Sequence, residues 1–114
     1  MDDIEIEELF SGLGPVTIKR MFGGKGVYHL GRIVAVVFRD ELLLKADVDT
    51  APAFEAAGAR QWTYDGQKDK LIKMPYWSTP DDALDDPDAM TRWARLAYEA
   101  ALRAKPGSKS TSRR

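Results

Sequence analysis

Apolar side chains are concentrated in a short run near the middle of the chain, residues 33–38. Ile33, Ala35 and Val37 alternate there with Val34, Val36 and Phe38. Because successive side chains of an extended chain point to opposite faces, both faces of this run are apolar. A strand with a solvated face carries more polar residues, so we predict that the run is the central strand of a sheet.

Short polar breaks separate this run from apolar segments on either side. Gly31 divides it from residues 27–30, and residues 40–41 divide it from the leucines at 42–44. These breaks suit tight hairpins and are too short for a crossover helix, so the strands should be antiparallel. With residues 16–22 leading into the first strand, a three-stranded antiparallel meander is expected.

Gly23, Gly24 and Gly26 lie at the start of this meander. A glycine-rich loop that binds phosphate is normally followed by a helix N-terminus or by a Lys-Ser/Thr pair, whereas a β-run follows here. We therefore interpret these glycines as turn or bulge residues that need positive φ or a close backbone approach.

Helical spacing appears near both ends of the chain. Ile6, Leu9, Phe10 and Leu13 mark one face of a short helix that Asp2 or Asp3 can cap. Met90, Trp93 and a series of alanines up to Ala104 mark one face of a long helix that begins after Asp86-Pro87. These many alanines allow the helix backbone to approach the sheet closely.

Shorter elements are expected between these parts. Asp49 or Thr50 can cap a helix that ends at Gly58, and residues 60–64 and 71–74 form a second hairpin. Thr79 is the expected cap, and Pro80 the first residue, of a single helical turn. The predicted order is therefore helix, three strands, helix, two strands, helix.

An aromatic pair follows the second hairpin in the segment Met74-Pro75-Tyr76-Trp77. Proline fixes its own φ and favours an extended conformation for Met74, so Tyr76 and Trp77 are held in a defined place. The pair can cover the core, or it can form a ligand platform or the centre of an interface. Trp62 and Trp93 have the same alternatives.

The length of 114 residues suits one domain. The charges are divided unevenly along the chain. All 18 acidic residues precede residue 103, whereas residues 103–114 carry five bases and no acid. We expect a domain over residues 1–105 and a flexible basic tail over residues 106–114. The candidate nucleic-acid contacts are Arg103, Lys105, Lys109, Arg113 and Arg114, with Lys68, Lys70 and Lys73 near Trp62 and Tyr64. The acidic body opposes phosphate, so only weak, salt-sensitive binding is expected.

Several kinds of chemistry are disfavoured by the composition. The absence of cysteine excludes disulfides and thiolate sites, and His29 is the only histidine. The aspartates at 81, 82, 85, 86 and 88 lack the glycine and glutamate of an EF-hand loop and are interpreted as helix caps. We predict no catalytic residues, cofactor or metal, with a small uncharacterised enzyme as the remaining alternative.

The location of the protein is predicted from two further features. The sequence has no apolar run of twenty residues, and its acidic first residues lack the pattern of a secretory signal. A cytoplasmic protein is therefore expected.

Several separated motifs resemble one family. They are Met21-Phe22-Gly23-Gly24, Gly26-Val27-Tyr28, Leu42-Leu43-Leu44-Lys45, Met74-Pro75-Tyr76-Trp77 with Pro80, and Asp86-Pro87 before Trp93. Together they resemble the N-terminal domain of the TfoX/Sxy regulators of bacterial natural competence, over roughly residues 6–104.

The resemblance implies an α+β fold, a two-layer α/β sandwich with an antiparallel five-stranded sheet, similar to type III secretion chaperones. It also implies a regulatory rather than catalytic role. In competence regulators this domain accompanies a C-terminal domain and works with a cyclic-AMP-responsive activator at promoters. The sequence ends where that second domain would begin, so a stand-alone form is expected.

These expectations favour a non-catalytic regulatory or adaptor domain that binds protein. If helices cover one face of the sheet, one apolar set of the central strand needs another cover, which a protein partner or a second copy can supply. The candidate interaction residues are Val34, Val36, Phe38, Tyr76 and Trp77. A homodimer is the simplest case, and the alternative function is weak nucleic-acid binding through the basic tail.

Overall fold

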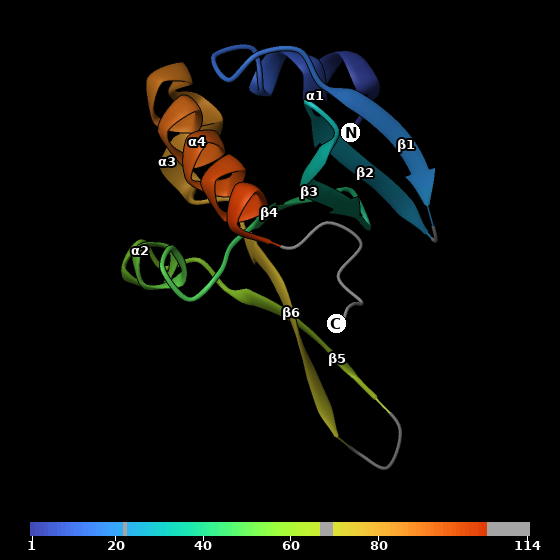
Figure 1. Cartoon of the computed structure of the whole chain (residues 1–114), viewed down its shortest axis with the longest axis vertical. Helices are drawn as coiled ribbons and strands as arrows, with labels where there is room; N and C mark the ends of the chain where they lie inside the picture. The colour runs from blue at the N-terminus through green and yellow to red at the C-terminus, as the bar shows by residue number, and fades with distance from the viewer. Residues whose placement is uncertain (22, 67–69, 105–114) are drawn as a thin grey trace.

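The computed structural model describes residues 1–21, 23–66 and 70–104 (Figure 1). The elements in chain order are α1 (Asp3–Leu9), β1 (Thr17–Met21), β2 (Gly24–His29), β3 (Arg32–Phe38), β4 (Glu41–Lys45), α2 (Ala51–Ala56), β5 (Gln61–Asp65), β6 (Leu71–Ser78), α3 (Asp81–Asp85) and α4 (Pro87–Arg103). The α+β class is confirmed. Phe22, residues 67–69 and residues 105–114, which include the predicted tail, lie outside the described residues.

The described strands form one antiparallel sheet with the order β1-β2-β3-β4-β6-β5. The apolar run forms β3, which pairs with β2 on one side and β4 on the other, so the central position is confirmed. The expected five strands are one too few, because the residues leading into the first strand form a strand of their own. This strand, β1, pairs with β2, and Met21 lies opposite Gly24.

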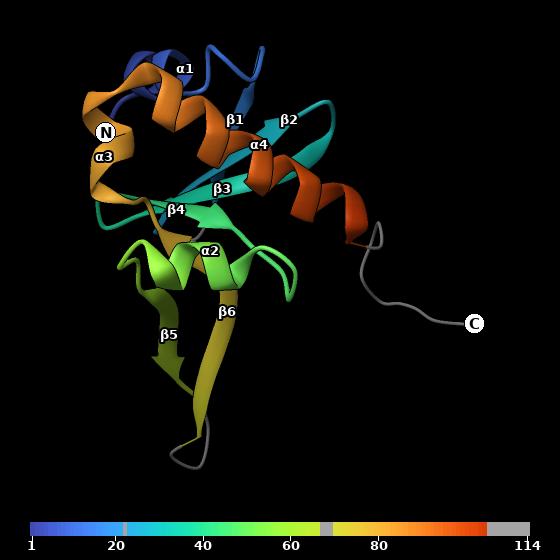
Figure 2. The same cartoon turned by 90° about the vertical axis from the view of Figure 1, so that its left-hand side faces the viewer.

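The helices lie on one side of the sheet (Figures 1 and 2). α4 packs along β3 and β4, and both α1 and α3 contact α4. Figure 2 shows α4 and α2 in front of the strands, and the ring of Phe54 in α2 lies 6.3 Å from that of Trp77 in β6. The helices and the sheet therefore form two layers. The helical turn and the long helix expected after the second hairpin are present as α3 and α4, although the predicted element order counted only one helix there.

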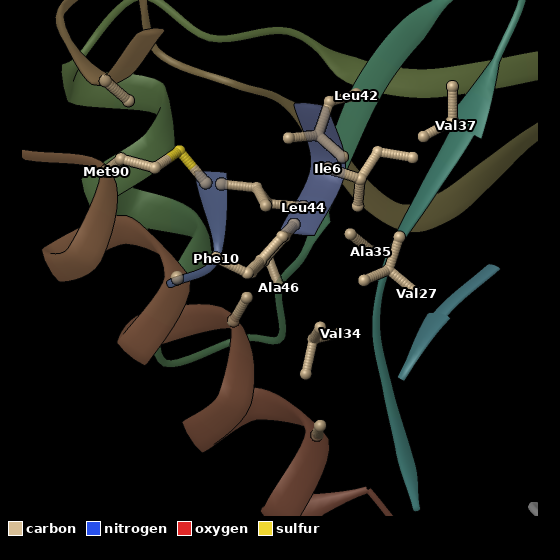
Figure 3. Packing of buried hydrophobic residues seen from close by; sticks show 14 of the residues in the cluster. Ile6, Phe10, Val27, Val34, Ala35, Val37, Leu42, Leu44, Ala46 and Met90 are labelled. Carbon is tan, nitrogen blue, oxygen red and sulfur yellow. The ribbon is translucent and has the colours of Figure 1, made fainter. Parts of the chain in front are cut away.

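The core lies between these two layers (Figure 3). Ile6 and Phe10 of the α1 segment, Leu44 of β4 and Met90 of α4 are almost fully buried. Alanines at 94, 97 and 101 of α4 are also buried, so the helix backbone comes close to the sheet. Full burial of a large apolar side chain contributes about 1.5–3 kcal/mol, which makes this contact the main source of stability.

A β-bulge changes which residues of β3 face the helices. Ala35 lies opposite Val27, and Ile33 lies opposite Tyr28, so Val34 is an extra residue between the two pairs. A bulge of this kind breaks the alternation of side chains along the strand. Val34 packs with Ala35 and Val37 in the core under α4, whereas Ile33 packs with Val36 and Phe38 on the other face. The predicted division, with Val34 beside Val36 and Phe38, is therefore wrong.

The glycines of the meander are structural. Gly23 has φ +68°, and a Cβ on Gly24 would lie 1.9 Å from the carbonyl oxygen of Val37. Gly23 adopts the left-handed region of backbone conformation, and Gly24 allows the backbone of Val37 to come close. The interpretation of these two glycines as structural residues is therefore confirmed.

The caps of the helices agree only in part with the sequence. Asp2 caps α1 and Asp86 caps α4, as expected. Thr79 does not cap α3, because its hydroxyl donates to the carbonyl oxygen of Leu42 and Pro80 occupies the N-cap position. Thr50 occupies the N-cap of α2 and makes no side-chain cap there.

His29 is a buried structural residue. Its Nδ1 lies 2.7 Å from the carbonyl oxygen of Pro15, which can only accept, so Nδ1 carries the proton and donates. Its ring also meets the edge of Tyr98 of α4 at 4.9 Å between centroids. The imidazole therefore ties the segment before β1 to the sheet and to α4.

A candidate interaction surface on the open face of the sheet

A second apolar cluster lies on the face of the sheet away from the helices. Its members are Ile33, Val36, Phe38, Leu43, Trp62, Met74 and Tyr76, all from strands. Val36, Leu43 and Tyr76 are buried beneath the others, which are half-buried. This set is called the open face below, because the described helices pack against the opposite side.

Aromatic rings connect the two halves of the open face. Phe38 of β3 lies 5.2 Å from Trp62 of β5, measured between ring centroids, and Trp62 lies 6.4 Å from Tyr76 of β6. Tyr64 continues this row at 6.3 Å from Trp62 and is 48% exposed. The rings bring together residues from strands that are far apart in the sequence.

Three cations lie over rings on this face. Lys19 lies 4.8 Å from the ring centroid of Tyr28, which is opposite Ile33 in the pairing of β2 and β3. Arg39 lies 5.3 Å from the Phe38 centroid, and Lys45 lies 5.3 Å from that of Tyr76. Cation–π contacts of this kind contribute about 0.5–1 kcal/mol at exposed sites and more when they are desolvated.

Burial affects the two ionisable groups at the centre of this face. Burial of the Lys45 ammonium lowers its pKa, and the nearby Asp47 carboxylate partly opposes this effect. Burial of the Tyr76 hydroxyl raises its pKa to about 12, with a smaller contribution from Tyr28. Tyr76 is therefore neutral at physiological pH, and Lys45 supplies the positive charge beside it.

A groove of about 670 Å³ lies at one end of the open face. Its lining includes the apolar and aromatic residues Phe38, Leu43, Trp62 and Tyr64 and the charged residues Arg39, Glu41 and Arg60. Arg60 lies 3.7 Å from Glu41 as an exposed ion pair. A groove lined by both apolar and charged side chains can bind a protein segment that carries apolar and polar groups side by side.

The candidate interaction residues from the sequence divide between the two layers. Val36, Phe38 and Tyr76 lie together on the open face. Val34 is fully buried under α4, and Trp77 packs on the core side, where its ring lies 6.3 Å from that of Phe54. Tyr76 and Trp77 are adjacent in an extended strand and so point to opposite faces.

The candidate nucleic-acid residues are only partly described. Arg103 ends α4 and forms an ion pair with Asp47, while Lys105, Lys109, Arg113 and Arg114 lie outside the described residues. Lys70 and Lys73 are exposed on the hairpin of β5 and β6, and Lys68 lies outside the described residues. Their role in binding nucleic acid stays a prediction.

The sequence did not single out the cations of the open face. Lys19, Arg39 and Lys45 have the appearance of ordinary solvated strand residues until strand pairing places each one over a ring. Of the two alternatives for Trp62, a cover for the core or the centre of an interface, its place on the open face favours the second. The sequence signal for this placement is the alternation Trp62-Thr63-Tyr64, which puts the two aromatic side chains on the same face of an extended strand.

Neither a group of metal ligands nor a membrane-spanning helix is present in the part of the chain that the structure describes. Within residues 1–21, 23–66 and 70–104, no three side chains of His, Cys, Asp or Glu are grouped so that they could hold a metal ion. None of the helices in that part of the chain combines the length and hydropathy that crossing a bilayer requires.

Comparison with known families gives one match that covers most of the chain. The model of the TfoX N-terminal domain matches residues 8–101, from α1 to the last turn of α4. No curated protein matches the chain.

Proposed function

The chain belongs to the TfoX N-terminal domain family, which is associated with the regulation of competence, and from this premise we propose a non-catalytic regulatory or adaptor role. In this proposal the domain acts by binding a protein through the open face. The binding serves the transcriptional control of competence-type genes.

One observation carries the proposal. The open face holds apolar and aromatic side chains on strands β3 to β6, while the described helices cover the other face. Contiguous apolar patches on a soluble domain mark interaction sites, because leaving them in water is unfavourable. Aromatic residues and arginine, which concentrate at the centres of protein interfaces, are present here as Phe38, Trp62, Tyr64 and Arg39.

The distribution of ionisable groups also supports binding rather than catalysis. In the described residues, Lys25 pairs with Asp3, Arg60 with Glu41 and Arg103 with Asp47. These pairs lie at separate places on the surface, and a catalytic acid and base need to converge on one reacting atom.

Site-specific photocrosslinking in the native cell tests the proposal. A photoreactive phenylalanine derivative is placed at Tyr64, next to Trp62 on the sheet, and in a second variant at Leu84 of α3. The two positions are 48% and 52% exposed, so they are equally accessible to chance encounters. We expect a discrete adduct from position 64 and none from position 84.

The adduct is then identified by mass spectrometry and its partner is purified for a binding measurement. Substitution Phe38→Ser in the full chain should abolish that binding without unfolding the domain, as circular dichroism would show. Equal adducts from both positions would contradict binding through the open face. A partner enzyme that needs this domain for its catalytic activity would contradict the non-catalytic role.

A further inference from the structure

The open face carries a strongly one-sided charge. Lys19, Arg39 and Lys45 lie over its rings, and Glu41, opposite Phe38, is the one carboxylate among the described residues of β1–β4 and β6 that share this face. Glu41 is already paired with Arg60. The face therefore presents cations to whatever covers it.

A second copy of the chain fits this face poorly. A symmetric dimer places the same patch of both protomers in contact, so the cations of both copies would be buried in one interface in which Glu41 is already paired with Arg60. Like charges brought together at a desolvated interface are unfavourable. Burial already lowers the pKa of Lys45, and further burial against another ammonium would add to that cost.

Single-stranded nucleic acid also fits poorly, although its phosphates are anionic. Bases stack on open, flat ring faces. Here cations lie over Tyr28, Phe38 and Tyr76, and Tyr76 is only 8% exposed. Trp62 packs against Phe38, which leaves Tyr64 as the most open ring of the row.

Carboxylates on a protein surface satisfy all of these features together. A carboxylate group is small enough to pair with an ammonium held over a ring, while aliphatic side chains beside it pack on Ile33, Met74 and the ring edges. In the described residues, none of Lys19, Arg39 and Lys45 is in ion-pair contact with a carboxylate. The Asp47 carboxylate that acts on Lys45 is itself hydrogen-bonded to Arg103, so the three cations can pair with the carboxylates of a partner.

We infer that the protein partner of the open face presents acidic side chains set among aliphatic ones, with carboxylates that pair with Lys19, Arg39 and Lys45. This inference rests on the proposed function, because it names the chemistry of the partner that the open face binds. The groove beside Arg39 and Arg60 accommodates one aliphatic side chain of such a segment together with a neighbouring carboxylate.

Selection from a library of random linear peptides displayed on phage, with the full chain as bait, tests the inference. We expect selected sequences to be enriched in Asp and Glu next to Leu, Ile or Val. The best peptide should shift the backbone amide resonances of Val36, Leu43 and Tyr76. Its copy with Asn and Gln in place of the acids should bind at least about tenfold more weakly.

Charge reversal on the protein gives an independent reading. Lys45→Glu should weaken the best peptide by about tenfold or more, and Lys45→Gln by less, with raised salt reducing the wild-type affinity. Arg92→Glu makes the same charge change on the exposed side of α4 and should leave the affinity within about twofold. If Lys45→Glu does not fold, the peptide with Asn and Gln in place of its acids still tests the inference, because its affinity is measured on the wild-type protein.

The remaining outcomes separate the inference from the proposed function. Peptides that shift the open-face amides but bind equally well without acids would overturn the inference and leave the proposed function intact. If no selected peptide shifts these amides, the proposed function fails as well. Self-association through the open face in sedimentation, or tight binding of an oligothymidine, would overturn the inference in favour of a second copy or of nucleic acid.

Discussion

Arg103, in the last turn of α4, donates two hydrogen bonds to the carboxylate of Asp47 in the loop between β4 and α2. Nε lies 2.6 Å from Oδ2, and Nη2 lies 3.1 Å from Oδ1. The backbone N–H groups of Asp49 and Thr50 also donate to Oδ1, each at 3.1 Å. One carboxylate therefore holds both the end of the longest helix and the start of α2.

This arrangement predicts a dependence of stability on pH. The Arg103 hydrogen bond, with smaller contributions from the backbone N–H groups, lowers the pKa of Asp47 from 3.8 to about 2. Between these two pKa values the unfolded chain binds more protons than the folded one. The contribution of the Asp47 carboxylate to the free energy of unfolding is therefore fully present above about pH 4 and is lost as the pH falls toward 2. We expect Asp47→Asn to cost about 1–2 kcal/mol at pH 7, less than the full shift implies, because solvent screens a partly exposed pair.

Urea unfolding of the wild type and of Asp47→Asn, followed from pH 7 to pH 2, checks this expectation. The two free energies of unfolding should converge at the acid end. Asp49→Asn is the matched control, because Asp49 lies 3.4 Å from Arg103 with 65% of its side chain exposed. It should cost less than about 0.5 kcal/mol. A difference between wild type and Asp47→Asn that stays constant with pH would contradict the role of this carboxylate.

The bulge in β3 predicts opposite behaviour for two valines that an unbroken strand would place on the same face. Val34 is fully buried in the core under α4, whereas Val36 lies on the open face. Threonine has the shape of valine but carries a hydroxyl in place of one methyl group, and burying that hydroxyl without a partner costs about 1–3 kcal/mol. We expect Val34→Thr to lose this amount and Val36→Thr, whose side chain is 6% exposed on the face away from the described helices, to lose less.

Chemical denaturation of the two variants measures the difference. Because both substitutions are the same and lie two residues apart on one strand, differences in propensity cancel. A larger loss from Val36→Thr than from Val34→Thr would contradict the placement of Val34 under α4 and of Val36 on the open face.

The sequence predicted the elements of the core well, but not the faces of β3. A run of apolar residues on both faces identifies a central strand, and β3 is such a strand, with β2 and β4 paired to its two edges. The bulge at Val34 depends on how β2 is aligned with β3, which is a property of the pair and not of either sequence. A purely apolar run gives no polar residue to mark the change of face.

The candidate site was predicted in part for a similar reason. Tyr76 is identified from the sequence because it follows a proline in an aromatic pair, and Phe38 because it belongs to one apolar face of the central run. The contact of Lys45 with Tyr76 joins residues from β4 and β6, which become neighbours only through the order of the sheet. Arg103 was grouped with the basic tail by charge alone, and its partner Asp47 lies far away in the sequence.

The close approach at Gly24 predicts a large effect of adding one methyl group. A Cβ there would lie 1.9 Å from the carbonyl oxygen of Val37, and backbone cannot move without breaking the pairing of β2 and β3. At Gly26 the nearest atom is the terminal methyl of Met21, at 2.8 Å, which a flexible side chain can move aside. We expect Gly24→Ala to cost about 3 kcal/mol or more and Gly26→Ala clearly less.

Thermal unfolding of these two alanine variants compares the sites directly. The pair also tests the role of the glycines, because a phosphate-binding loop would lose ligand affinity rather than stability. Equal stability of wild type and Gly24→Ala would show that the backbone of Val37 does not approach Gly24 in solution.

The turn between β2 and β3 predicts a stabilising substitution. Leu30 has φ +52° and Gly31 has φ +83°, so this two-residue connection has positive φ at both positions, as in a type I′ turn. A leucine in the left-handed region costs about 1–2 kcal/mol, whereas Asn-Gly is the favoured sequence for such a turn. Leu30 is 73% exposed, so its removal takes little from the core. We expect Leu30→Asn to raise the free energy of unfolding by about 0.5–1 kcal/mol.

Differential scanning calorimetry should show this as a rise in Tm of about 2–6 °C. Leu30→Ala is the control, because alanine also removes the exposed apolar side chain but keeps the penalty of a Cβ at positive φ. An equal gain from alanine and asparagine would assign the effect to the loss of exposed apolar surface. A gain confined to asparagine would assign it to the backbone of the turn, and the same reasoning would then extend to Arg39 and Asp40, whose φ values are also positive.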